Sequence, residues 1–153
     1  MSRFELKLPP LVWAALVAVA MALVAAAAPT HELPPLLRRM GAGVLAVLGV
    51  ALVVAGVIGF RRAGTTLNPM RPQQSAALVS SGVYRISRNP MYLGMLLLLL
   101  AWALWLSLGW TLAGPPAFVW LMNRWQIAPE ERALTTLFGD DYAAYRAQVR
   151  RWL

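Results

Sequence analysis

Cysteine is absent from the 153-residue chain, which also has a single histidine, His31, and a single lysine, Lys7. Without cysteine there is no thiolate for catalysis, haem attachment or metal binding. One histidine cannot build a metal centre from several imidazoles, so no metal site is expected. Charged side chains are scarce as well, at 13% of the residues against 59% hydrophobic, which is typical of a membrane protein.

The few charges sum to +8, because fourteen basic side chains outnumber six acidic ones. Such an excess could indicate a nucleic-acid partner. Here, however, the basic residues flank long uncharged runs, and they form no basic patch interleaved with aromatic residues. Nucleic acid is therefore not an expected partner, and membrane lipids are.

Long apolar runs predict about four transmembrane helices, since a bilayer core is spanned by about 20 apolar residues. The fourth run is shorter and contains Pro115 and Pro116, so we expect a hairpin partner of the third helix that is kinked at the prolines or begins there. The alanine-rich end of the first run also resembles a signal-peptide cleavage site, and a cleaved leader is the alternative for that run. The predicted spans are residues 11–28, 40–60, 91–110 and 111–127.

Arginine is concentrated in the loop 61–90 and in the C-terminal segment 129–152. Because positive charge gathers in cytoplasmic loops, both segments and both termini are predicted to face the cytoplasm, with Arg38 and Arg39 as the exception on the other side. Residues 1–153 then form a single all-α membrane domain. The short chain, rich in alanine and arginine, is typical of a bacterial inner-membrane protein.

The C-terminal segment changes character after Pro129, where apolar residues recur at helical spacing and charges occupy the opposite face. Gly139, followed by Asp140 and Asp141, resembles a helix stop and a new N-cap. We therefore expect two short amphipathic helices against the membrane surface or the bundle. Their apolar face comprises Leu134, Leu137, Phe138, Tyr145, Val149 and Trp152.

Asn89 and Pro90 mark the start of the third helix, because asparagine favours the N-cap and proline the first helical position. The unpaired N–H groups and the positive dipole end then point toward the cytoplasmic loop, where they could bind a carboxylate or phosphate. The alternative is that the pair only caps the helix and that nearby arginines only anchor it at the interface.

A second polar cluster follows the fourth run and contains Arg124, Glu130 and Glu131. The two glutamates could simply form the first turn of a solvated helix, where acidic residues suit the dipole. If the third and fourth helices form a tight hairpin, however, this cluster meets residues 88–92 at the same membrane face. The two clusters would then line one pocket.

Two motifs in these clusters resemble the isoprenylcysteine carboxyl methyltransferase and phospholipid methyltransferase families. Residues 88–94 read R-N-P-M-Y-L-G, and residues 130–145 read E-E-R-A-L-T-T-L-F-G-D-D-Y-A-A-Y. The family patterns are R-H-P-x-Y-x-G and E-E-x-x-L-x-x-x-F-G-x-x-Y-x-x-Y. The resemblance extends from about Gly64 to Trp152, and the order and spacing of the two motifs make it specific.

The resemblance implies a membrane-embedded methyltransferase that uses S-adenosylmethionine, and the glycine-rich fingerprint of a Rossmann enzyme is missing from the sequence. It assigns an arginine near the end of the last helix, here Arg124, to the substrate carboxylate. The residues it assigns to the cofactor are Ala76, Ala77, Leu78, Val79, Tyr84, Asn89, Pro90, Met91, Tyr92 and Glu130. Tyr84 and Tyr92 could face the sulfonium cation, and Glu130 could meet the amine.

Asn89 departs from the family pattern, which has histidine at this position. Asparagine cannot titrate near neutral pH, which argues for cofactor binding over proton transfer. The departure also argues against a prenylated protein as acceptor and leaves open another lipophilic acid, amine or lipid headgroup from the bilayer. The rival hypotheses are a nicotinamide-dependent membrane reductase of the steroid-reductase type and a non-catalytic membrane scaffold.

Overall fold

The computed structural model describes residues 6–28, 33–64, 75–107 and 109–153. Within these ranges the regular elements are all helical, which confirms the all-α prediction. In chain order they are α1 (Pro10–Ala27), α2 (Pro35–Arg62), η2 (Gly82–Arg85), α3 (Pro90–Trp105), η3 (Gly109–Ala113), α4 (Gly114–Leu121), η4 (Met122–Ile127) and α5 (Ala128–Gln148). The elements η2 and η3 are short 3₁₀ helices, whereas η4 is a stretch of π-helix.

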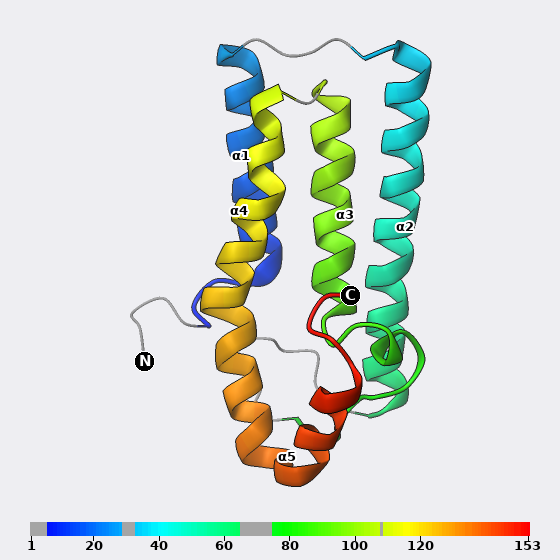
Figure 1. Ribbon diagram of the computed structural model, residues 1–153, viewed down its shortest axis with the longest axis vertical. Helices are drawn as coiled ribbons and strands as arrows, with labels where there is room; N and C mark the ends of the chain where they lie inside the picture. Colours follow the sequence, from blue (N-terminus) through cyan, green and yellow to red (C-terminus); the bar gives the residue numbers. More distant parts are fainter. Residues whose placement is uncertain (1–5, 29–32, 65–74, 108) are drawn as a thin grey trace.

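The helices form an antiparallel bundle in which α3 lies between α2 and the pair α1 and α4 (Figure 1). The contact between α2 and α3 is the most extensive one in the bundle. The core between α1, α3 and the α4–η4 segment is built from Val17, Met21, Tyr92, Leu99, Ala103, Phe118, Met122 and Ile127. Beyond η4, α5 continues past the start of α3, and the chain then turns back so that the C-terminus lies beside that start (Figure 1).

Two of the helices, α1 with 18 residues and α2 with 28, are long and apolar enough to cross a membrane. Their outward faces carry exposed leucine, valine and methionine side chains, as expected where lipid replaces water, for example Leu16, Leu23, Met40 and Val47. These helices match the first two predicted spans, with α2 beginning five residues earlier and ending two residues later than predicted.

The third helix is shorter than predicted, because α3 ends at Trp105 instead of Trp110. The cause is local backbone geometry, since Ser107 and Gly109 both have positive φ angles, of 65° and 66°, which no α-helix contains. The chain then reverses, and α4 begins at Gly114 with the two prolines at its start, the second of the two arrangements expected for them. Membrane crossing by α3 and α4 stays a prediction.

Gly139 interrupts α5 with φ 48° and ψ −119°, so the C-terminal segment consists of two helical pieces as expected. Around this break Tyr142, Tyr145 and Val149 are buried and pack against Leu134 and Phe138. Leu137, predicted on the same apolar face, is 43% exposed. Trp152 packs against the main core instead.

Glycine allows α2 and α3 to approach closely, in keeping with the small residues seen at helix crossings in membranes. A Cβ atom on Gly94 would lie 2.6 Å from the Gly49 carbonyl oxygen, and one on Gly49 would lie 2.8 Å from the Gly94 carbonyl oxygen. Both obstacles are backbone atoms, so the helices themselves would have to separate. Further along α2, a Cβ atom on Gly56 would instead meet side chains, those of Met91 and Tyr84.

Replacing Gly94 with alanine should therefore destabilise the protein by roughly 1 to 3 kcal/mol, the usual cost of overpacking a close contact. The measurement is denaturant or thermal unfolding in a fixed detergent. Gly43→Ala is the matched control, since nothing lies within 4 Å of its added Cβ. That variant should be neutral or more stable, because alanine favours the helix by about 0.5 to 1 kcal/mol. Equal losses in both variants would contradict the close contact.

Candidate active site

The start of α3 is held by the C-terminal end of the chain. The Arg88 backbone N–H donates to the Arg150 carbonyl oxygen at 3.0 Å. The Ser87 hydroxyl and the Asn89 side-chain amide both donate to the carbonyl oxygen of Arg151, at 3.4 and 2.9 Å. Asn89 thus occupies the N-cap position as predicted, yet its side chain does not cap the helix, because the amide is used in this long-range contact.

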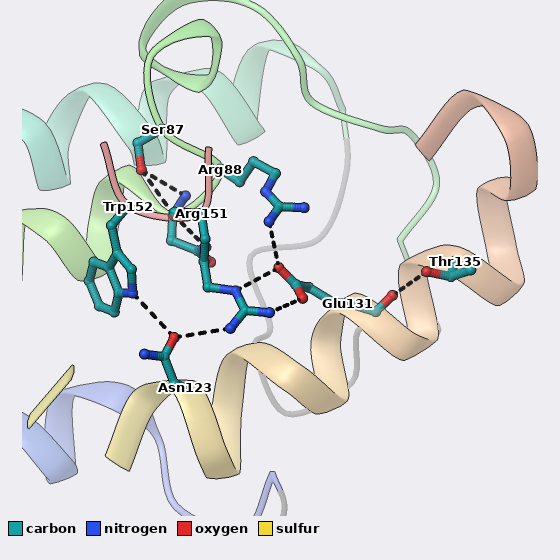
Figure 2. A network of polar contacts seen from close by, with 8 residues as sticks. Ser87, Arg88, Asn123, Glu131, Thr135, Arg151 and Trp152 are labelled. Carbon is teal, nitrogen blue, oxygen red and sulfur yellow. Dashed lines mark hydrogen bonds and ion pairs between the residues drawn. The ribbon is translucent and has the colours of Figure 1, made fainter. Parts of the chain in front are cut away.

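Glu131 joins the same region through ion pairs (Figure 2). Its carboxylate lies 3.1 Å from Arg88 Nη2, and its two oxygens receive Arg151 Nε at 3.1 Å and Nη2 at 2.5 Å. The side chains of Arg88 and Glu131 are only 10% and 11% exposed. Asn123 completes the cluster by accepting hydrogen bonds from Arg151 Nη1 and Trp152 Nε1. Glu131 therefore connects the start of α3, the π-helical segment and the C-terminal end.

Glu130, the preceding residue, has a different environment. Its Oε1 atom accepts hydrogen bonds from the Tyr92 hydroxyl at 2.7 Å and from the Gln126 amide at 2.6 Å. Both donors are neutral, so neither supplies the positive charge that a buried carboxylate requires. Burial is the main influence on this group and raises the pKa of Glu130 to about 7, although the two hydrogen bonds oppose the rise. Near neutral pH this carboxyl can therefore both bind a cation and exchange a proton.

Tyrosines form much of the remaining wall. Tyr84, in η2, packs edge-on against Phe60 with ring centroids 5.4 Å apart, and the Tyr145 hydroxyl donates to the Tyr84 carbonyl oxygen at 2.7 Å. Burial raises the pKa of Tyr84 well above its usual value and raises that of Tyr145 to about 12. Both rings stay neutral at physiological pH and present polarisable faces suited to a cation.

These groups surround one pocket at the end of the bundle where α3 begins. Its cavity volume is about 110 Å³, and the cavity is partly open to solvent. The lining residues are Phe60, Ser75, Ala77, Leu78, Val79, Tyr84, Arg88, Asn89, Pro90, Met91, Tyr92, Ile127, Glu130, Glu131, Leu134, Tyr142 and Tyr145.

Nine of the ten residues predicted to bind the cofactor lie in this lining, and Ala76 does not. Arg124, predicted to meet the acceptor, lies exposed on η4 and outside the lining as well. The roles of all these residues stay predictions.

Sequence reasoning missed Arg151 and Asn123, which the structure places in the ion-pair cluster, because nothing local in the sequence indicates that the chain folds back onto α3. Tyr142 and Tyr145 could have been found, since both belong to the second motif.

Comparison with known proteins adds an independent finding. A family model described as phospholipid methyltransferase matches residues 37–141, a range that includes the first motif and the first part of the second. An uncharacterized protein of Haemophilus influenzae is 52% identical over 65 residues, which are 41% of this chain and 100% of that protein. No solved structure matches the chain.

Glu131 is expected to stabilise the fold. Glu131→Gln should lower stability by roughly 2 to 4 kcal/mol, because it leaves the buried Arg88 guanidinium without its counter-charge. This energy range allows for Arg151, whose side chain is 37% exposed and partly screened by water. Thermal unfolding in detergent measures the change. Asp141→Asn removes the same charge from an exposed position of α5 and should leave the melting temperature nearly unchanged. If the two variants change the melting temperature equally, the cluster has no structural role.

Proposed function

The chain belongs to the phospholipid methyltransferase family, and on that basis we propose that it transfers a methyl group from S-adenosylmethionine to a lipophilic acceptor in the membrane. One observation carries the proposal: nine of the ten residues predicted to bind the cofactor come from segments far apart in the sequence and line one pocket. The pocket contains an acid, neutral aromatic rings and a helix N-terminus. A scaffold would have no need for that combination.

The residues fit the chemistry of this cofactor. Glu130 is a partly buried carboxyl whose hydrogen-bond donors, Tyr92 and Gln126, are neutral, so a bound ammonium group would supply the missing charge. The rings of Tyr84 and Tyr92 offer faces to a sulfonium cation. No side chain caps α3, which leaves its first N–H groups for an anionic group.

When bound, S-adenosylmethionine supplies an electrophilic methyl group, and the acceptor's lone pair forms the new bond while the electron pair of the carbon–sulfur bond remains on sulfur. Within this chain, Glu130 and the tyrosines bind the cofactor and orient it. Positioning and the exclusion of water are expected to provide most of the rate, since effective concentrations in well-oriented sites reach very large values. A carboxylate acceptor needs no general base, because its oxygen already carries the electron pair that forms the new bond.

The acceptor is proposed to reach the pocket from the bilayer as a lipid, a lipidated molecule or another lipophilic carboxylate or amine. Apolar side chains in the lining, including Ile127 and Leu134, suit such a molecule. Arg124 lies on the π-helical segment outside the pocket and is proposed to meet an anionic acceptor group as it approaches. The distribution of arginine supports the proposal that the pocket lies at the cytoplasmic face of a bacterial inner membrane.

A calorimetric titration of the purified protein distinguishes the proposal from its rivals. S-adenosylhomocysteine should bind in detergent or in nanodiscs, whereas NADPH should not. Binding of NADPH alone would favour the reductase. For a scaffold, neither ligand should bind, and Tyr92→Ala and Glu130→Ala should leave the cellular phenotype intact.

The affinity for S-adenosylhomocysteine should depend on pH through Glu130. Because the pKa of Glu130 is about 7 in the free protein and a bound ammonium favours the carboxylate, affinity should be greatest above pH 7. Below that value it should fall by up to about tenfold per pH unit, as the site must first lose a proton. Glu130→Gln should weaken binding at pH 8 by roughly 1.5 to 3 kcal/mol and remove this pH dependence.

The same variant should not lose stability. A carboxyl whose pKa is raised on folding favours the folded state least at high pH, so wild-type stability should decline from about pH 4.5 to pH 7 and then level off. Glu130→Gln escapes that decline and should melt at or above the wild-type temperature at pH 8. A lower melting temperature with unchanged affinity would remove Glu130 from the site and assign it to the fold.

A further inference from the structure

Arg88 has more hydrogen-bonding capacity than its surroundings use. Its Nη2 atom pairs with Glu131, but its Nε and Nη1 atoms are buried and have no hydrogen-bond partner within the described chain (Figure 2). The side chain is 10% exposed, and Arg88 contributes to the lining of the pocket. Leaving buried donors of a charged group unsatisfied is costly, so a partner is expected.

The charge balance indicates that this partner is an anion. In the ion-pair cluster two guanidinium groups, of Arg88 and Arg151, share the single carboxylate of Glu131. One positive charge is therefore left over. Arg151 does not line the pocket and already reaches both oxygens of Glu131 and the side chain of Asn123, so the excess lies on the pocket side, at Arg88.

The start of α3 adds to this preference. The first residues of the helix are in the same lining as Arg88, and the Asn89 side chain that would ordinarily cap them is bound to the Arg151 carbonyl oxygen. Free N–H groups and the positive end of a 16-residue helix therefore adjoin the unpaired guanidinium nitrogens. Arg88 has free N–H groups on two nitrogens, and a guanidinium directs such donors at a carboxylate more specifically than an ammonium would.

We propose that Arg88 binds the carboxylate of the cofactor's amino-acid end while Glu130 binds its ammonium group. The inference rests on the proposed function, and it assigns to Arg88 a ligand as well as an ion pair. The two charges of an amino acid are attached to one carbon, so its site requires a cation and an acid in one pocket. Arg88 and Glu130 meet this need, because both line the same pocket. Arg88 is held there by its ion pair with Glu131, the residue after Glu130.

The test removes the carboxylate from the ligand before changing the protein. Wild-type protein is titrated by calorimetry with S-adenosylhomocysteine and with S-adenosyl-3-thiopropylamine, which lacks only the carboxylate. We expect the complete ligand to bind roughly 10- to 100-fold more tightly. In Arg88→Lys, whose ammonium can still pair with Glu131, this preference should shrink by about tenfold. Arg151→Lys is the matched control, because it alters the same ion-pair cluster outside the pocket, and it should retain the wild-type preference.

Each other outcome has a distinct meaning. Equal affinity of the two ligands for wild-type protein would overturn the assignment of Arg88 and leave the proposed function standing. Failure of both ligands to bind would contradict the proposed function and this inference with it. The phosphate of an acceptor lipid is the other possible anion, probed with dihexanoylphosphatidylethanolamine. If Arg88→Lys weakens binding of that lipid but keeps the preference for the complete nucleoside, the carboxylate assignment is wrong.

Discussion

The ion pairs of Glu131 with Arg88 and Arg151 hold the candidate site together. Three segments meet there: the residues before α3, the first turn of α5 and the C-terminal end of the chain. The junction gives the start of α3 and the start of α5 a charged contact at the mouth of the bundle. The Asn89 and Ser87 contacts with the Arg151 carbonyl oxygen depend on it as well, because the side chain of Arg151 is fixed by Glu131.

The junction also explains why two adjacent glutamates have different tasks. Successive helical residues point about 100° apart, so Glu131 meets the arginines while Glu130 faces Tyr92 and Gln126. Glu131 has its charge balanced by arginine, whereas the hydrogen-bond donors to Glu130 are neutral and burial raises the pKa of Glu130 to about 7. The fold thus keeps one carboxylate compensated and presents the other, uncompensated, to the pocket. A cationic ligand is the natural complement of the second.

Much of this arrangement could be predicted from the sequence. Apolar runs and prolines located the helices. The family resemblance predicted ten cofactor-binding residues, and nine of them line the pocket. Residues whose role depends on contacts with distant parts of the chain were harder to predict. Asn89 has the sequence features of an N-cap, yet its amide binds a carbonyl 62 positions away. Arg151 resembles an ordinary interface anchor, and only the return of the chain to α3 shows that it pairs with Glu131. The end of α3 depends on positive φ angles near Ser107 that its composition does not indicate.

The central claim is that this pocket transfers a methyl group to a lipophilic molecule. Its most direct test supplies S-adenosylmethionine tritiated in the methyl group to membranes from a deletion strain and from strains that express the wild-type chain or a folded Glu130→Gln variant. After organic extraction, label should appear in a lipid-soluble product with the wild-type chain and fall to the deletion background with the variant. A wild-type chain that binds S-adenosylhomocysteine yet leaves the organic extract unlabelled would contradict the account.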